Sequence, residues 1–214
     1  LMLLSGGTTA LPKLIPRTHN DYIYNFSQSA RIAGFGPDTV LLLTLPLAHN
    51  YNLGSPGMLG ALALGGRVVI APRGDCNTVF SLVEKERVTN IQAAVPLIVN
   101  WLNDPALDRF DVSSLQVVQQ GGARLSSELR DRLRKRLGCQ FQEDYGTAEG
   151  LLNLTRLDDP DDIVLHSSGA PICPDDEIKI LDEDGNEVAD GEMGELVTRG
   201  PYTLRGYYNA PQIN

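Results

Sequence analysis

Short segments of strand-like composition alternate with helical segments over most of this 214-residue chain. Val40–Leu45 is a continuous apolar run, typical of a strand that is buried on both faces of a sheet. Further strands are predicted at Arg67–Ala71, Ile91–Val95, Leu115–Gln119 and Gln140–Tyr145. The alternation predicts an α/β fold with a parallel, doubly wound sheet and helices on both of its faces.

Capping residues mark where two of the predicted helices begin. Asn77 or Thr78 is expected to cap the helix that precedes Ile91, and Ser126 or Ser127 the helix that precedes Gln140. The second of these helices carries leucines at helical spacing, which form an apolar stripe. Its basic residues are predicted to lie on the solvent face: Arg130, Arg132, Arg134, Lys135 and Arg136.

The pattern changes after about residue 155. Glu177–Leu181 and Glu195–Thr198 read as short strands, and the Asp-Gly-Asn at 184–186 is typical of a hairpin turn. We expect an α/β core over residues 1–155, incomplete at its N-terminus, and a small antiparallel β subdomain over residues 156–214. Because the chain starts within a predicted strand and stops without a capped helix, we expect the central part of a longer enzyme, inactive by itself.

Composition and charge exclude several classes of function. A net charge of −9 and a pI near 4.8 argue against nucleic acid or an anionic membrane as a partner, since both select basic patches. No apolar run approaches the roughly 20 residues of a membrane span. Cys76, Cys139 and Cys173 have no paired spacing, which indicates a reducing, cytoplasmic location rather than a disulfide framework or a zinc site.

The segment Ser5–Lys13 reads Ser-Gly-Gly-Thr-Thr-Ala-Leu-Pro-Lys and follows the apolar run Leu1–Leu4. Glycines let the backbone approach a ligand closely, and hydroxyl and N–H groups can surround phosphate oxygens. Lys13 adds a positive charge at the far end of the segment. The spacing is not that of the common P-loop, and a flexible surface turn is the alternative interpretation.

Three further loops follow predicted strands, at the edge where parallel sheets bind ligands. Residues 46–56 offer polar groups beside Tyr51, which suits a hydroxylated aromatic acid; the alternative is an ordinary loop in which His49 is bonded locally. Gln119–Arg124 contains paired glycines that admit a planar ring or simply form a tight turn. Tyr145–Gly150 offers a hydroxyl group for phosphate and a carboxylate for Mg²⁺.

In this order, these motifs resemble those of the adenylate-forming superfamily, which contains acyl-CoA synthetases, peptide-synthetase adenylation domains and luciferases. The string Ile15–Tyr22, the His-Asn-Tyr at 49–51 and Glu149–Asn153 are most similar to one branch. That branch is the stand-alone aryl acid–AMP ligases, which activate 2,3-dihydroxybenzoate or salicylate in siderophore and related pathways. The resemblance covers essentially the whole chain.

The resemblance implies a role for each matching residue. ATP would be bound by Ser5, Gly6, Gly7, Thr8, Thr9, Lys13, Gly122, Ala123, Arg124, Glu143, Asp144, Tyr145, Gly146 and Thr147. The aryl acid would be bound by His49, Asn50, Tyr51, Ser55, Gly121, Ala123, Asp144 and Leu152, with Asn50 bonding the ortho hydroxyl. Glu149 would hold Mg²⁺, and the catalytic residues within this chain would be Lys13, Thr147 and Glu149. A further lysine, in a C-terminal domain of the family, would lie beyond Asn214.

Asp144 departs from the branch, which normally has a small apolar residue beside the aryl ring. A buried carboxylate without a partner is costly. We therefore expect Asp144 either to turn to solvent or to face a hydrogen-bond donor on an amino- or otherwise donor-substituted acid.

The resemblance implies ATP-dependent formation of aryl-AMP with release of pyrophosphate. Transfer of the acyl group to the phosphopantetheine thiol of an aryl carrier protein would follow. An amino-acid adenylation domain and an acyl-CoA ligase are alternatives within the superfamily. A non-catalytic nucleotide-binding module is the alternative from another class.

Overall fold

The computed structural model describes residues 1–6 and 12–214. Its main element is a seven-stranded sheet with the order β4-β3-β5-β6-β7-β8-β9. The strands are β3 (Val40–Leu43), β4 (Arg67–Ile70), β5 (Asn90–Ala93), β6 (Val117–Gly121), β7 (Gln140–Gly146), β8 (Leu152–Leu154) and β9 (Ala170–Pro171). The first five strands in this order, β4, β3, β5, β6 and β7, pair in parallel. Strands β8 and β9 extend the sheet by antiparallel pairing.

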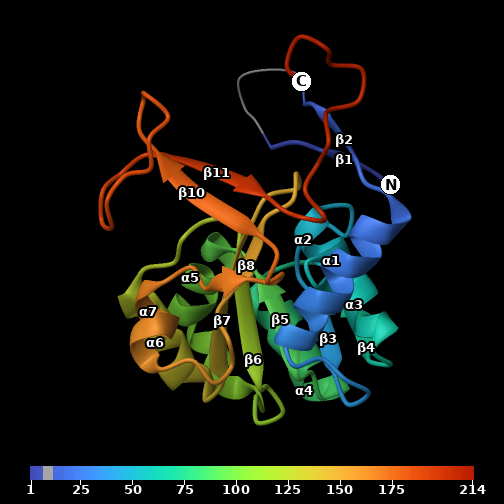
Figure 1. Cartoon of the computed structure of the whole chain (residues 1–214). Helices are drawn as coiled ribbons and strands as arrows, with labels where there is room; N and C mark the ends of the chain where they lie inside the picture. The colour runs from blue at the N-terminus through green and yellow to red at the C-terminus, as the bar shows by residue number, and fades with distance from the viewer. Residues whose placement is uncertain (7–11) are drawn as a thin grey trace.

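Helices cover both faces of this sheet (Figure 1). Leu41 and Leu43 of β3 pack in one cluster with α1 (His19–Ile32) and α3 (Gly57–Ala63). Leu42 packs on the opposite face, in a cluster that also contains Val79, Phe80 and Leu133. That face is covered by α4 (Cys76–Glu86), α5 (Val95–Asn103), the 3₁₀ helix η1 (Pro105–Arg109), α6 (Ser127–Leu137) and α7 (Asp161–His166). The predicted α/β class, with a largely parallel sheet covered on both faces, is confirmed.

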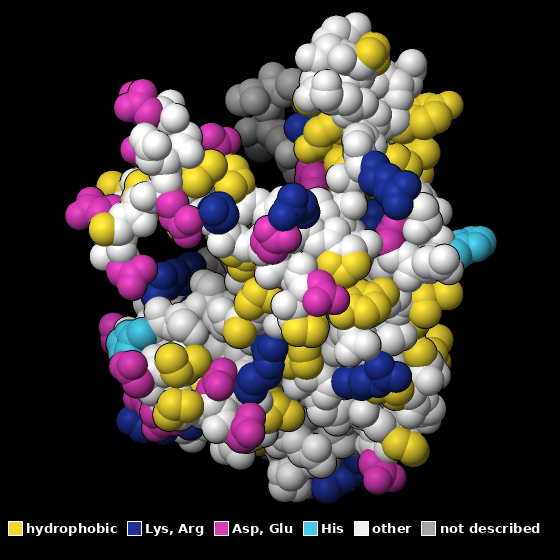
Figure 2. All heavy atoms as spheres, in the orientation of Figure 1, with side chains coloured by type: hydrophobic (Ala, Val, Ile, Leu, Met, Phe, Trp, Pro, Cys, Tyr) yellow, Lys and Arg dark blue, Asp and Glu magenta, His cyan; other side chains and the backbone are white. Residues whose placement is uncertain are grey.

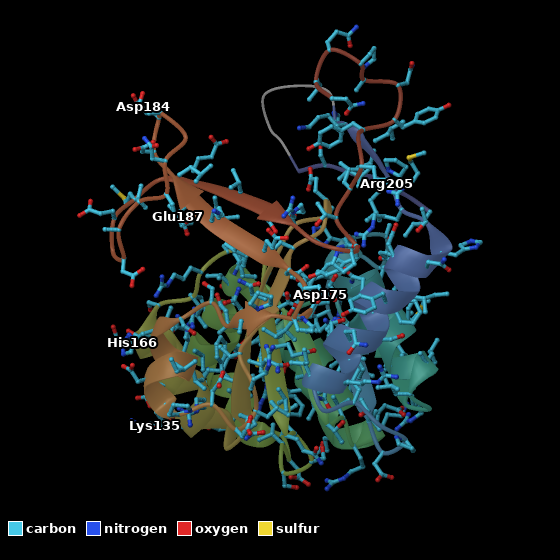
Figure 3. The ribbon with its side chains drawn as sticks, in the orientation of Figure 1. Lys135, His166, Asp175, Asp184, Glu187 and Arg205 are labelled. Atoms are coloured by element: carbon cyan, nitrogen blue, oxygen red, sulfur yellow. The ribbon has the colours of Figure 1, made fainter. Side chains whose placement is uncertain are left out.

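Two hairpins lie beyond the same end of the sheet (Figure 1). One joins β1 (Met2–Leu4) to β2 (Leu14–Pro16), and the other joins β10 (Glu177–Leu181) to β11 (Glu195–Arg199). Figure 3 places Asp184 at the outer tip of the second hairpin, away from the sheet. Exposed apolar side chains gather around the first hairpin (Figure 2), where Leu4 retains 64% of its accessible surface.

The second of the two expected segments, residues 156–214, contributes to both parts of this arrangement. Helix α7 and strand β9 belong to the large sheet and its helical layer, whereas β10 and β11 form their own sheet. The division at residue 155 stays a prediction about independent folding units. Over residues 1–6 and 12–214, no helix combines the length and the apolar character that crossing a bilayer requires.

Two local predictions need correction. The cap of α4 is Asp75, not Asn77 or Thr78, because the Asp75 carboxylate accepts a 3.0 Å hydrogen bond from the Thr78 backbone N–H. Residues 46–55 are not all loop, since they contain the short helix α2 (Asn50–Gly54). A helix of one turn is too short to show apolar periodicity. Ser126 caps α6, as one of the two candidates predicted.

The prediction that the basic residues of α6 all face solvent is wrong for Arg130, which is fully buried. Its guanidinium donates to the carbonyls of Leu125, Val164 and Ser167, at 2.9, 3.0 and 2.9 Å. Its Nη2 also lies 2.9 Å from a carboxylate oxygen of Glu143. These partners replace the water that a buried guanidinium loses. Arg130 therefore joins α6 to α7 and β7.

Candidate functional site

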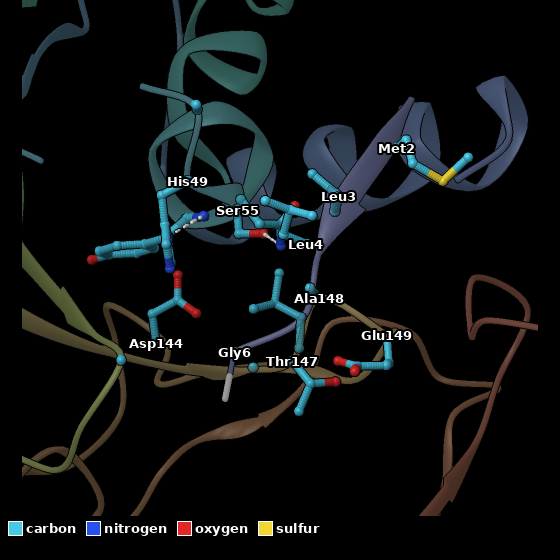
Figure 4. Close-up of a pocket in the computed structure, with 16 residues that line it drawn as sticks. Met2, Leu3, Leu4, Gly6, His49, Ser55, Asp144, Thr147, Ala148 and Glu149 are labelled. Atoms are coloured by element: carbon cyan, nitrogen blue, oxygen red, sulfur yellow. Dashed lines mark hydrogen bonds between the residues drawn. The ribbon is translucent and has the colours of Figure 1, made fainter. Parts of the chain in front are cut away.

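A pocket of about 770 Å³ opens at the carboxyl end of the parallel strands, beside the β1–β2 hairpin (Figure 4). Most of the residues that line it come from the motifs singled out in the sequence. The lining residues are Met2, Leu3, Leu4, Gly6, Ala48, His49, Asn50, Tyr51, Ser55, Gly122, Asp144, Gly146, Thr147, Ala148, Glu149 and Leu152. The structure thus brings the α2 loop and the loop after β7 together around one cavity.

The first wall of the pocket is built on helix α2. Asn50 is held from both ends of its amide: its Oδ1 accepts from the Tyr22 hydroxyl at 2.8 Å, and its Nδ2 donates to Ser55 Oγ at 3.1 Å. Burial raises the pKa of Tyr22 to about 12, so its hydroxyl remains a donor near neutral pH. His49 caps the helix, with Nδ1 accepting from the Tyr51 backbone N–H at 3.2 Å. His49 therefore both lines the pocket and makes the local hydrogen bond of the alternative interpretation.

Buried amides fix the position of α2 from below. Asn25 of α1 donates to the Gly54 carbonyl at 2.7 Å, and Asn52 donates to the Leu45 carbonyl at 2.6 Å. At Gly57, the first residue of α3, φ is +52° and a Cβ would overlap the Asn52 carbonyl oxygen. Only glycine fits this corner without a shift of the backbone. The segment that contains α2 is therefore held in place by α1 and by the chain segment that follows β3.

The second wall is formed by β7 and β8. Asp144 and Leu152 line the pocket there, and Asp144 is only 4% exposed. The ring of Tyr51 packs beside Gly121, where a Cβ would lie 3.2 Å from two of its ring atoms. A Cβ on Gly146 would approach Leu152 Cδ1 to 2.6 Å, so glycine there allows β8 to pack closely. This wall combines apolar surface with one buried carboxylate.

Asp144 does not turn to solvent, which removes one of the two expectations for it. Its Oδ2 is buried and has no hydrogen-bond partner among the described residues, and the Tyr51 hydroxyl is in the same condition. Burial raises the pKa of Asp144 well above its usual value, and the negative charge of Glu143 adds to this effect. Burial and the Asp144 charge likewise raise the pKa of the Tyr51 phenol.

A third side of the pocket carries Gly6, Thr147 and Glu149, which Figure 4 shows opposite His49 and Ser55. Glu149 is oriented by Tyr207, whose hydroxyl donates to Glu149 Oε1 at 3.0 Å. The Lys13 Nζ lies 4.1 Å from the centroid of the Tyr207 ring. Tyr207 thus contacts both a carboxylate that lines the cavity and an ammonium group.

The glycine- and hydroxyl-rich segment is closed at its base. The Ser5 N–H donates to the Lys13 carbonyl, and the Lys13 N–H donates to Ser5 Oγ, both at 2.9 Å. The phosphate-binding role predicted for Gly7, Thr8 and Thr9 falls on residues outside the described ranges. Gly6, immediately before them, lines the pocket.

Several residues predicted to bind ATP or acid do not line the pocket: Ser5, Lys13, Gly121, Ala123, Arg124, Glu143 and Tyr145. The Glu143 side chain is directed to Arg130 of α6, and Arg124 donates to the His166 carbonyl at 2.6 Å. The Ala123 carbonyl accepts from the Gln120 amide at 2.5 Å. Their predicted contacts with a nucleotide or an acid stay predictions.

Three residues that position the site were missed in the sequence. Tyr22 holds Asn50, Tyr207 holds Glu149, and Arg17 donates to the Ala148 carbonyl at 3.0 Å. Tyr22 belongs to the string Ile15–Tyr22 that carries the family resemblance, but nothing in the spacing of Tyr22 or Tyr207 indicates which side chain each of them reaches. Met2, Leu3 and Leu4 also line the pocket, although the apolar composition of this segment predicts only a strand.

The donor set fits a magnesium ion shared with a nucleotide. Among residues 1–6 and 12–214, no group of three His, Cys, Asp or Glu side chains is arranged to hold a metal. Mg²⁺ at ATP sites is typically held by one or two carboxylates together with phosphate oxygens and water. Glu149, oriented by Tyr207, is a carboxylate of the kind that such a site uses.

Comparisons with known proteins agree with this geometry. A family model described as AMP-binding enzyme matches residues 1–208. The chain is 51% identical over 211 residues to pyochelin synthase PchD of Pseudomonas aeruginosa, and 48% identical over 211 residues to a 2,3-dihydroxybenzoate-AMP ligase of Bacillus subtilis. A 2-hydroxy-7-methoxy-5-methyl-1-naphthoate–CoA ligase of Streptomyces carzinostaticus is 48% identical over 215 residues.

Solved structures give the same result. The apo structure of MbtA from Mycobacterium smegmatis matches 100% of this chain with a TM-score of 0.93 and 42% identity. The amide bond synthetase McbA from Marinactinospora thermotolerans matches 99% of it with a TM-score of 0.85 and 29% identity. The alignments with PchD and with the B. subtilis ligase include 99% of this chain but only 39% of each relative. The match to MbtA likewise spans only 39% of the MbtA chain.

Proposed function

Because this chain belongs to the family of AMP-binding enzymes, we propose that the natural protein activates an aryl carboxylic acid with ATP. The products are the aryl adenylate and pyrophosphate. The observation that carries the proposal is the single pocket in which Asn50 of the α2 wall and Glu149 of the loop after β7 converge. Relatives named for 2,3-dihydroxybenzoate-AMP ligation and pyochelin synthesis support an aryl acid as substrate.

The reaction is a displacement at the α-phosphorus of ATP. An oxygen of the acid carboxylate forms a new bond to that phosphorus, and the bond from it to the bridging oxygen breaks. Pyrophosphate leaves with the electron pair of that bond, and the acid remains as a mixed anhydride with AMP. Catalysis of this kind depends on positioning and on stabilising charge at the phosphoryl oxygens.

Residues of this chain would share that task. Thr147 and the segment that Ser5 and Lys13 close would donate hydrogen bonds to phosphate oxygens, and Lys13 would add positive charge. Glu149, held by Tyr207, would bind Mg²⁺, which neutralises charge on the phosphates. These assignments rest on the lining of the pocket and on the family resemblance.

The acid would lie between the α2 wall and the β7–β8 wall. Asn50 has a second amide hydrogen beyond the one given to Ser55, and this hydrogen suits an ortho hydroxyl or carboxylate oxygen. Tyr51 and Leu152 would flank the ring. Because Tyr22 fixes the Asn50 amide, the hydrogen-bond donor is pre-oriented before the acid arrives.

After adenylation we propose transfer of the acyl group to a thiol. In a siderophore pathway this thiol would be the phosphopantetheine of an aryl carrier protein, with AMP as the leaving group and a thioester as the product. The naphthoate–CoA ligase relative favours coenzyme A as the second candidate acceptor. Cys76, Cys139 and Cys173 are free, consistent with work in the reducing cytoplasm where ATP is made.

The proposal is tested by ATP–pyrophosphate exchange with the natural full-length protein. Salicylate and 2,3-dihydroxybenzoate should support exchange, whereas a panel of amino acids should not. N50A should raise the KM of the acid, and E149A should raise the Mg²⁺ requirement. If only an amino acid supports exchange, the substrate is an amino acid and not an aryl acid. If the protein binds ATP but catalyses no exchange, it is a non-catalytic nucleotide-binding module.

A further inference from the structure

The least explained group in the pocket is the carboxylate of Asp144. It lies at the carboxyl end of β7, lines the cavity and is 4% exposed. Its Oδ2 is enclosed without a hydrogen-bond partner from the described residues. Buried carboxylates in proteins are normally paired or hydrogen-bonded, because an unpaired one forfeits its hydration.

Among residues 1–6 and 12–214, no lysine or arginine side chain forms an ion pair with this carboxylate. The adjacent Glu143 points to the opposite face of the sheet, where it forms an ion pair with Arg130. Arg124 donates a hydrogen bond to the His166 carbonyl. Two titratable residues of the α2 wall, His49 and Tyr51, line the same pocket, and neither is hydrogen-bonded to Asp144 within the described part of the chain. Of the described buried polar side-chain atoms without a partner, those of Asp144 and Tyr51 are the ones whose residues line the pocket.

The backbone prevents Asp144 from moving out. Residue 144 pairs with Gly121 in the parallel ladder on one side and with Leu154 in the antiparallel ladder on the other. A residue held in both ladders cannot rotate its side chain to the other face without breaking the register. The carboxylate therefore stays in the acid-binding pocket whether or not a ligand is present.

We propose that Asp144 is a specificity-determining residue that selects an aryl acid carrying a hydrogen-bond-donating amino or hydroxyl substituent. This inference rests on the proposed function and adds the substrate class. The substituent is not the one that meets Asn50, because Asn50 belongs to helix α2 and Asp144 to strand β7, and both line the pocket. The acid thus has a second donor on the ring edge that faces the sheet.

The chemistry favours a donor over an apolar group of equal size. An amino or hydroxyl group gives the enclosed oxygen the partner that it lacks, whereas a methyl group leaves it unpaired and displaces any water. A site built to bond a polar substituent rejects an analogue that lacks it far more strongly than an apolar pocket rejects one that has it. Discrimination should therefore be large.

The test compares acids that differ at one ring position in the natural full-length protein. Salicylate, 3-methylsalicylate, 2,3-dihydroxybenzoate and 3-aminosalicylate are assayed by ATP–pyrophosphate exchange, and their binding is measured by calorimetry without ATP. The protein should use the hydroxyl- or amino-bearing acid with a kcat/KM at least about a hundredfold above that of the methyl analogue. D144V should abolish or invert this preference, with 3-methylsalicylate gaining.

D144N keeps the shape of the side chain and serves if D144V fails to fold; it should reduce the preference for donor-bearing acids without removing it. Equal use of methyl- and donor-bearing acids by the natural protein, or a preference unchanged in both variants, would overturn the role of Asp144. In that case exchange with aryl acids still occurs, so the proposed function stands. Failure of every aryl acid to support exchange would instead reject the proposed function itself.

Discussion

The Tyr207 hydroxyl donates a 3.0 Å hydrogen bond to Glu149 Oε1, between residues 58 positions apart in the chain. The Leu204 N–H reinforces this contact by donating to the Glu149 carbonyl at 2.6 Å. Tyr207 also lies under the Lys13 ammonium group. The segment around residue 207 therefore orients the carboxylate proposed to bind Mg²⁺.

Y207F should weaken the response to Mg²⁺ while leaving the fold intact. The ring that Lys13 covers is retained, and only the hydrogen bond to Glu149 is lost. A net loss of about 1 kcal/mol per hydrogen bond corresponds to a roughly three- to tenfold rise in the Mg²⁺ concentration for half-maximal exchange. Y208F is the matched control, since Tyr208 is 59% exposed. An unchanged Mg²⁺ dependence in Y207F would remove the positioning role.

Y22F should raise the KM of the aryl acid and leave the KM of ATP unchanged. The Tyr22 hydroxyl holds Asn50 Oδ1, and without it the amide can rotate away from the acid. We expect an increase of about three- to tenfold. Y24F on the same helix is the control, because the Tyr24 ring packs on Tyr202, with centroids 5.7 Å apart. Equal effects on both substrates would point to a general loss of structure.

The stability of the protein should fall as the pH rises from about 4.5 to about 7. Burial raises the pKa of Glu143 from 4.5 to about 7, although Arg130 opposes the shift. Between these values the native state binds more protons than the unfolded state, so deprotonation costs stability. The full contribution is present below pH 4.5 and is lost as the pH passes through about 7.

E143Q should flatten this part of the profile of unfolding free energy against pH, measured by urea titration. The raised pKa of Asp144 acts in the same direction. The comparison is therefore made between D144N and the D144N/E143Q double variant. A profile with the same slope in both proteins would show that Glu143 is not the titrating group.

G57A should destabilise the protein by several kcal/mol. This loss is larger than the cost of placing an alanine at a positive φ, because the Cβ would also overlap a neighbouring atom. Gly57 has φ of +52°, and a Cβ there would overlap the Asn52 carbonyl oxygen. At Gly185 φ is +81°, but no atom lies within 4 Å of a Cβ. G185A therefore isolates the backbone cost, about 1 kcal/mol. Equal losses in the two variants, measured by denaturant unfolding, would mean that the corner at Gly57 relaxes.

The sheet and the place of the site could be predicted from the sequence for a physical reason. Strands buried on both faces must be continuously apolar, as Val40–Leu43 is, and ligand-binding loops follow the carboxyl ends of such strands. The segments around Asn50 and Glu149 could therefore be placed at one edge before the structure was known. The added assignment of aryl acid and ATP came from the family resemblance.

The rest depends on contacts between distant residues. Arg130 has the sequence context of a surface helix, and it is buried because carbonyls from α7, which lies more than 30 positions away, surround it. The contacts of Tyr22 with Asn50 and of Tyr207 with Glu149 likewise span 28 and 58 positions. No local periodicity indicates such pairs, since they follow from how separate elements pack.

Glu143 and Asp144 are neighbours on one strand, yet one is anchored to helix α6 and the other faces the cavity. Two adjacent residues therefore have separate tasks: Glu143 attaches helix α6 to the sheet, and Asp144 is the proposed determinant of which acid is accepted. On the role proposed for Asp144, point substitutions at residue 144 would change which acid is accepted while the contact between Glu143 and Arg130 is preserved, whereas an insertion or deletion of one residue in β7 would exchange the faces of the two carboxylates. Evolution of new substrate ranges on this scaffold should therefore proceed by replacement at that position rather than by changes in strand length.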